Sequence, residues 1–317
     1  GQNAFKGSAS TTTDADGTVA IGKDALLALT TGAGNLAIGK DALTANTSGG
    51  SNVAIGDTAL RDIVTGGANV AIGRNAGQAL GAGENGNILI GMASGQALDE
   101  GDNGVIDSNI AIGKDCFIGG NLNTASTTVK GNIAIGTDAM NSTGTNASLG
   151  QIAIGFEALT AMTSGLENVA VGYQSADALT TGGYNTAVGH GTLSALVGGN
   201  FNTALGRNAL ASAGNNETSN VALGVNAMAN CDEGSGSGNQ IDQNIAIGVD
   251  CLVGADFGGT GSRVLTNNIA IGGDALNSTG TNSQNGTIAI GFASLTALTS
   301  GARNLGIGYQ SLYQADV

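Results

Sequence analysis

Two acidic segments carry the residue types of a Ca²⁺ site, because carboxylates and loop carbonyl oxygens are the ligands that this hard cation prefers. Both segments contain Asp-Glu-Gly followed some residues later by Ile-Asp. The strict acidic spacing of an EF-hand or of a nonapeptide Ca²⁺ repeat is missing. Solvated loop acids are therefore the alternative to a Ca²⁺ site, whose candidate ligands are Asp99, Glu100, Asp107, Asp232, Glu233 and Asp242.

The cysteines and the histidine give little support to nucleophilic or redox chemistry. No spacing typical of a zinc or redox site links Cys116, Cys231 and Cys251, so we expect buried thiols that pack as small apolar side chains. His190 is the only histidine, so a Ser-His-Asp arrangement would depend on it alone. We therefore expect that the protein is not an enzyme and that it has no catalytic residue and no cofactor-binding residue.

A five-residue phrase recurs sixteen times along the chain, at intervals of 17 to 24 residues. It consists of a polar residue (usually Asn), an aliphatic residue or Thr, Ala, a second aliphatic residue and Gly. A short period sustained end to end is the signature of a solenoid, in which each coil buries its apolar face by stacking. We expect one continuous rod over residues 1–317, a β-solenoid or β-roll of about 16 stacked coils of 17–24 residues, with phrase glycines at Gly22, Gly39, Gly56, Gly73, Gly91, Gly113, Gly136, Gly155, Gly172, Gly189, Gly206, Gly224, Gly248, Gly272, Gly291 and Gly308.

The intervals between phrase glycines contain a longer period of seven coils. One super-repeat covers residues 22–155, a second covers 155–291, and a third begins before residue 317. The residues agree with the intervals, because the segment Asp138–Asn146 returns almost unchanged as Asp274–Asn282. The sequence therefore indicates duplication of a seven-coil block.

Within the phrase, aliphatic residues alternate with small ones, which is the periodicity of a β-strand. We expect Val53, Ile55, Val70 and Ile72 to point into the coil. The Ala and Gly residues of the phrase would then line the outer face, and the phrases of successive coils would form one parallel sheet in register.

The residues after each phrase glycine, numbered +1, +2 and so on, follow a three-residue rhythm. Asp or Asn at +2 is typical of a helix N-cap, and large apolar residues at +4 and +7 share one helix face. Each coil is therefore a short parallel strand plus a short helical turn, with a second strand as the alternative. The helical turns are expected near Asp24–Leu29, Asp41–Ala45, Glu157–Met162 and Ser294–Leu298.

The coils of 22–24 residues contain extra segments. Because a buried loop would leave backbone polar groups unsatisfied, we expect these segments to project as loops. They lie near residues 99–108, 118–131, 232–243 and 254–267.

Composition narrows the possible partners. The chain has 56 Gly, no Pro and 3% aromatic residues, which suits a thin coil with tight turns. The net charge of −14 argues against nucleic acid or an anionic membrane as a partner. No apolar run is long enough to span a membrane, and we expect no signal peptide in this stretch.

The phrase Asn-x-Ala-Ile-Gly resembles the head repeats of trimeric autotransporter adhesins (Hep/Hag, YadA-like heads) and similar repeats of phage tail fibres. The resemblance extends from Gly17 to the end of the chain, although the coils here are longer than the family's. It implies a homotrimeric rod, extracellular or carried on a virion, that binds host or receptor surfaces.

Two functional hypotheses follow. The first is a structural fibre segment, extracellular, on a cell surface or on a virion, that displays loops for attachment or lateral assembly. The alternative is a binding module with a flat repetitive face, either an adhesin for polysaccharide or a host surface, or an ice-binding protein. An ice-binding face needs columns of Thr, but Thr occupies the second phrase position only at Thr186 and Thr203.

Under either hypothesis we expect self-association as the main interaction. A homotrimer would form through the Ala/Gly face, and coil stacking would extend it end to end into a filament. A surface receptor or polysaccharide is the other expected partner, with no nucleic acid and no membrane span.

Overall fold

The computed structural model describes residues 1–6, 14–98, 104–119, 128–142, 148–232, 240–254, 264–277 and 283–313. The chain divides into two compact units, Gly1–Ser164 (unit 1) and Gly165–Val317 (unit 2). Each unit is a parallel β-solenoid, and no helix occurs in the described ranges. The predicted fold class is therefore confirmed.

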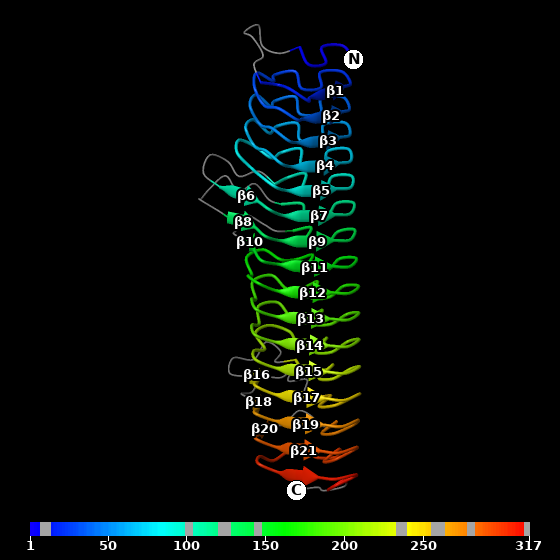
Figure 1. The fold of residues 1–317 in the computed structure, drawn as a ribbon. Coiled ribbons are helices and arrows are strands. Elements are labelled where there is room, and N and C mark those ends of the chain that lie inside the picture. The colour runs from blue at the N-terminus through cyan, green and yellow to red at the C-terminus, as the bar shows by residue number, and fades with distance from the viewer. Residues whose placement is uncertain are drawn as a thin grey trace. The chain divides into compact units, whose positions relative to one another are not determined.

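In the described part of unit 1, eight three-residue strands form a parallel sheet in the order β1-β2-β3-β4-β5-β7-β9-β11 (Figure 1). Every strand is the centre of a phrase, and the pairing is in register, so that Ala54 lies between Ala37 and Ala71. The strands are Val19–Ile21 (β1), Leu36–Ile38 (β2), Val53–Ile55 (β3), Val70–Ile72 (β4), Ile88–Ile90 (β5), Ile110–Ile112 (β7), Ile133–Ile135 (β9) and Ile152–Ile154 (β11).

Unit 2 repeats this arrangement. Its described residues form eight main strands in the order β12-β13-β14-β15-β17-β19-β21-β22, again parallel and in register (Figure 1). These strands are Val169–Val171 (β12), Thr186–Val188 (β13), Thr203–Leu205 (β14), Val221–Leu223 (β15), Ile245–Ile247 (β17), Ile269–Ile271 (β19), Ile288–Ile290 (β21) and Leu305–Ile307 (β22).

The two faces of the main strands are the reverse of our expectation. Ala54 and Ala71 are fully buried, whereas Val53, Ile55 and Val70 are only half-buried and Ile72 is 37% exposed. The prediction that the aliphatic residues point inward was therefore wrong. The coil interior is too narrow for them once Leu side chains from +4 and +7 enter it, so the small Ala faces inward. The proposed assembly through an outer Ala/Gly face is wrong for the same reason.

The phrase asparagines occupy the interior as a hydrogen-bonded column. The Asn69 Oδ1 accepts from the backbone N–H of Asn87 at 3.0 Å, and Asn69 Nδ2 donates to the Glu84 carbonyl at 2.8 Å and to Asn52 Oδ1 at 3.1 Å. An amide both donates and accepts, so asparagines of successive coils can pair with one another, whereas Thr18, Gln151 and Thr287 stand at the same phrase position in three coils. Burial of amides such as those of Asn52 and Asn69 costs little because they are paired.

The residues after the phrase glycine form neither the expected helical turn nor a strand. The residues at +2 and +4 have left-handed backbones in all sixteen described coils, with φ between 48° and 62°. Their N–H groups bond between coils instead of along a helix. Asp41 N donates to the Lys23 carbonyl at 2.9 Å in the preceding coil, and Leu43 N donates to the Ala59 carbonyl at 3.1 Å in the following one. As a result, the consecutive residues at +3 and +4, such as Ala42 and Leu43, are both buried in the core.

The phrase glycines are fixed by backbone stacking. Their φ angles lie between 120° and 147°, a region open only to glycine. A Cβ added to Gly56 would lie less than 3 Å from the carbonyl oxygen of Gly73 in the next coil. Gly1 stacks on Gly22 in the same way, so Gly1–Phe5 continues the column by one partial coil.

The extra segments of the longer coils are partly built into the solenoid, so the prediction that they project as loops was wrong for those parts. In the described part of unit 1, Val105–Asp107 (β6), Thr128–Lys130 (β8) and Ser148–Leu149 (β10) form a second parallel sheet (Figure 1). Gln240–Asp242 (β16), Val264–Thr266 (β18) and Gln284–Asn285 (β20) do the same in unit 2. Every second residue, such as Ile106 or Leu265, is buried. Residues 99–103, 120–127, 233–239 and 255–263 lie outside the described ranges.

Substituting a phrase glycine should unfold its coil. We expect Gly56→Ala to lower the free energy of unfolding by about 3 kcal/mol or more, because Ala is strained at this φ and its Cβ meets a backbone oxygen. Gly83→Ala is the control, since a Cβ there meets no atom within 4 Å. Urea denaturation followed by circular dichroism compares the two, and equal midpoints would contradict the stacking argument.

Removing one buried amide should also be costly. Asn69→Ala takes away the acceptor of the Asn87 N–H and the donor to Glu84, and we expect a loss of about 3 kcal/mol or more in unfolding free energy. Ser51→Ala, at an exposed position where the next coil carries Ala68, should change it by less than about 0.5 kcal/mol. A similar midpoint for the two variants in urea would show that the Asn column is dispensable.

Candidate functional site

The described Ca²⁺ candidates Asp107 and Asp242 have a structural role. Asp107 Oδ1 accepts from the backbone N–H of Asn85 at 2.8 Å, and Asp242 Oδ1 accepts from that of Thr218 at 2.8 Å. Burial raises the pKa of Asp242, and the Thr218 N–H opposes this rise. Both carboxylates thus cap the backbone of the preceding coil.

Of the remaining Ca²⁺ candidates, only Asp232 belongs to the described ranges. Asp99, Glu100 and Glu233 are not among the described residues, and Asp232 lies beside Gly214. No group of three or more His, Cys, Asp or Glu side chains suited to a metal occurs among the residues that the structure describes. The Ca²⁺ site stays a prediction.

The three cysteines are buried thiols, as expected. Each donates to a backbone carbonyl, with Sγ–O distances of 3.1 Å from Cys116 to Ala134, 3.2 Å from Cys231 to Leu252 and 3.1 Å from Cys251 to Ala270. Burial raises the pKa of both Cys116 and Cys251 to about 12. A neutral thiol is a poor nucleophile, so these side chains are suited to packing.

Two carboxylates that sequence reasoning did not single out are buried at corresponding positions of the two units. Glu84 and Glu217 are at most 1% exposed. Their Oε1 atoms accept from the backbone N–H groups of Gly81 and Gly214, at 3.0 Å and 2.9 Å. Each stands where the 17-residue coils carry Gly, so the carboxylate holds together the turn of an 18-residue coil.

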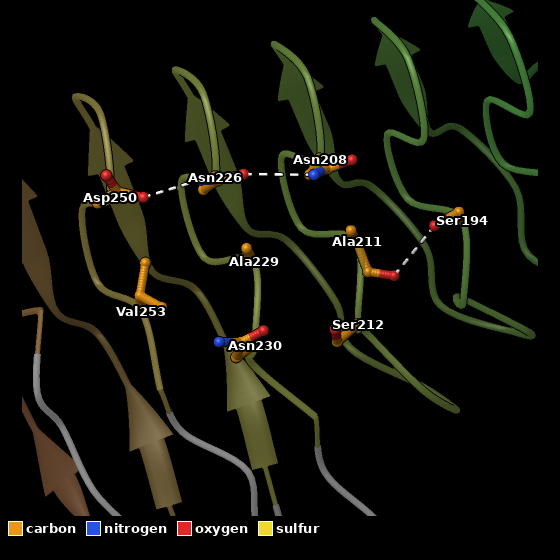
Figure 2. A pocket seen from close by; sticks show the side chains of 9 residues that line it. All are labelled: Ser194, Asn208, Ala211, Ser212, Asn226, Ala229, Asn230, Asp250 and Val253. Atoms are coloured by element: carbon orange, nitrogen blue, oxygen red, sulfur yellow. Dashed lines mark hydrogen bonds between the residues drawn. The ribbon is translucent and has the colours of Figure 1, made fainter.

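A polar groove lies on the turn side of unit 2 (Figure 2). Its volume is about 470 Å³, and it crosses four successive coils. A second hollow of about 410 Å³ shares Ser212 and Asn230 with it and continues to Asp232 and Gly254. The residues lining the groove are Ser194, Asn208, Ala211, Ser212, Asn226, Ala229, Asn230, Asp250 and Val253.

One wall of the groove is a column of polar side chains at +2. Asn208 Nδ2 lies 3.4 Å from Asn226 Oδ1, and Asn226 Nδ2 donates to Asp250 Oδ1 at 2.9 Å (Figure 2). The three residues have left-handed backbones, with φ of 57°, 56° and 52°, a conformation that Asn and Asp adopt more readily than most residues. Coil stacking and these bonds fix the wall in place.

Small residues at +5 open the groove, and the corresponding coils of unit 1 differ there. Unit 2 carries Ser194, Ala211 and Ala229 at +5, whereas unit 1 carries Arg61, Gln78 and Gln96. The Arg61 guanidinium contacts the oxygen of the Gln78 carboxamide, and the Gln96 side chain lies beside the other end of the same carboxamide. Sequence reasoning missed this site, although aligning the two super-repeats at +5 would have found it.

A second candidate surface is the aliphatic ladder, defined as the second and fourth phrase residues of the main strands in each unit. Ile72 and Ile247 are each 37% exposed, and Leu205 is 51% exposed. The column at +1 borders the ladder. In unit 1 it contains Lys23, Lys40, Arg74 and Lys114, and in unit 2 it contains the stacked pairs Tyr173–His190 and Phe292–Tyr309, whose ring centroids are 5.0 Å and 5.6 Å apart.

The fold defines the chain as a parallel β-solenoid repeat protein. No protein-family model, curated protein or solved structure matches the chain. The described residues contain no helix that is long and apolar enough to cross a membrane.

The thiols should be inert in the folded protein. Because the folded-state pKa of Cys116 and Cys251 is about 12, both stay protonated at pH 8, and we expect no reaction with iodoacetamide within hours. After denaturation in guanidinium all three cysteines should react. Rapid labelling of the native protein, measured by mass spectrometry, would contradict the burial.

The raised pKa of Cys116 and Cys251 makes the stability of the folded protein depend on pH in a defined direction. Between pH 9, the ordinary thiol pKa, and about 12, the unfolded chain loses thiol protons that the folded chain keeps. Stability therefore falls as pH rises through this window. The Cys116→Ala/Cys251→Ala variant, which places the common +3 residue at both sites, should show a shallower fall.

Proposed function

We propose that the chain is a segment of an extracellular, cell-surface or virion fibre that assembles through its aliphatic ladders. The observation that carries this proposal is that each unit presents two columns on the outer face of its main sheet, which consist of Val, Ile or Leu except for Thr186 and Thr203 in unit 2. A surface of this kind gains free energy when it is removed from water.

A second copy of the same chain is the partner that suits this surface best. Eight strands spaced about 4.8 Å apart make a ladder roughly 34 Å long. With a width of about 10 Å, each ladder offers roughly 340 Å², so the two ladders of a chain offer roughly 680 Å², against the roughly 800 Å² that each partner of a stable interface buries. Another copy has the same spacing between rows, so its side chains can interdigitate coil by coil.

The resemblance of the phrase to trimeric autotransporter heads and phage tail fibres supports a three-fold assembly and an extracellular or virion location. The corrected orientation of the strands adds to this support. It directs aliphatic side chains outward, where an oligomer would cover them. A structural role of this kind requires no catalytic residue and no cofactor.

Charges placed on the ladder should prevent assembly. We expect the chain to sediment at three times its 30.6 kDa mass, and the Ile72→Lys/Ile247→Lys variant to sediment as a monomer, because each Lys would be buried without a partner. Ala33→Lys/Val197→Lys adds the same charge at exposed positions outside the strands and should leave the trimer intact. Sedimentation equilibrium at micromolar concentration is the measurement, and a monomeric wild-type chain would refute the proposal.

A further inference from the structure

We propose that the polar groove of unit 2 binds a neutral polysaccharide. The groove lies on the turn side of its coils, among residues at +2, +5 and +6, whereas the aliphatic ladder lies on the strands. Assembly through the ladder therefore leaves the groove to a different ligand, and the two proposals are independent.

The extent of the groove favours a polymer over a small molecule. Its lining comes from four successive coils, which at about 4.8 Å per coil correspond to a length of about 14 Å. The second hollow extends it past Ser212 and Asn230 toward Asp232. A linear chain of sugar rings suits this elongated site.

The chemistry of the lining selects hydroxyl groups. Asn208, Asn226 and Asn230 offer both N–H donors and carbonyl acceptors, and Ser194 and Ser212 add hydroxyls. A sugar hydroxyl donates and accepts in the same way, so it can pair with any of these groups. Asp250, and Asp232 in the second hollow, are the only ionisable side chains among the lining residues. Both are acidic, so an anionic glycan is disfavoured.

The groove is also preorganised. Hydrogen bonds hold Asn208, Asn226 and Asp250 to one another, and the backbone N–H of Asn226 donates to the Arg207 carbonyl of the preceding coil at 2.9 Å. A site that is already ordered loses little conformational entropy on binding. In unit 1 the long side chains of Arg61, Gln78 and Gln96 stand at the corresponding +5 positions, where unit 2 has Ser194, Ala211 and Ala229.

The test uses the full chain and three neutral hexasaccharides, made of (1→4)-linked glucose, (1→3)-linked glucose or (1→4)-linked mannose, with isothermal titration calorimetry as readout. We expect at least one to bind with a Kd of about 1 mM or tighter. Asn226→Ala should weaken that binding at least about tenfold, because it removes an amide from the wall. Ala stands at the same position of the corresponding unit 1 coil, at Ala93 with φ of 56°, so the variant should fold.

A second variant fills the groove with side chains that the fold already carries. Ala211→Gln/Ala229→Gln reproduces Gln78 and Gln96 of unit 1 and should abolish binding. Thr296→Gln makes the same kind of change at +5 of a coil outside the groove and should leave the affinity unchanged. Circular dichroism verifies that each variant is folded.

Three results would overturn the proposal: no binding of any of the three sugars, equal affinity in the wild type and the filled variant, or tighter binding of a glucuronic acid hexasaccharide than of the neutral ones. Sedimentation of the same samples reports on assembly separately. If a variant loses sugar binding but still forms trimers, the substitution affected the groove and not the assembly. If the wild-type chain is monomeric but binds sugar, the fibre proposal is refuted and the groove proposal stands.

Discussion

The backbone contact between successive phrase glycines is the constraint on which the rest of the structure depends. At Gly56 the chain passes so close to Gly73 that a Cβ has no space, and the φ of 143° excludes other residues. Within each unit, stacking at this distance keeps each coil in register with the next. Like residues therefore form columns, and a column satisfies groups that a single coil cannot. The buried asparagines are tolerated because each finds its partners in adjacent coils.

The repeat, the parallel register and the coil boundaries could be predicted from the sequence, because they depend on spacing alone. The direction of the strand faces could not. Alternation places Val53 and Ile55 on one face of the strand and Asn52 and Ala54 on the other. Hydrophobicity within one coil predicts that the aliphatic face is buried, which is wrong. Asn52 can be buried because its hydrogen-bond partners belong to other coils. The helical turns failed for a related reason. Residues with left-handed backbones, such as Asp41 and Leu43, form hydrogen bonds between coils. The spacing of apolar residues within one coil cannot predict those bonds.

The groove illustrates a limit on site prediction in repeat proteins. Its residues are ordinary in type, and no short motif distinguishes Asn226 or Ala229. What distinguishes them is the difference between the two super-repeats, in which Gln78 and Gln96 are replaced by Ala211 and Ala229. The acidic segments gave a clearer signal in the sequence, yet Asp107 and Asp242 cap backbone N–H groups. In a stacked fold, a change of residue type along a column of equivalent positions is a better indicator of a binding site than the residue type at one position.

The phrase asparagines form a buried column, and the aliphatic residues of the phrase face outward; this arrangement determines which groups the protein presents to solvent. Hydrogen exchange of the asparagine side-chain amides, followed by NMR, tests it most directly and does not depend on the oligomeric state. Asn52, Asn69 and Asn87 should exchange their Nδ2 hydrogens as slowly as the strand amides exchange theirs, while the exposed Asn3 exchanges quickly. Exchange of the phrase asparagines as fast as that of Asn3 would place them in solvent and reverse the faces of every strand.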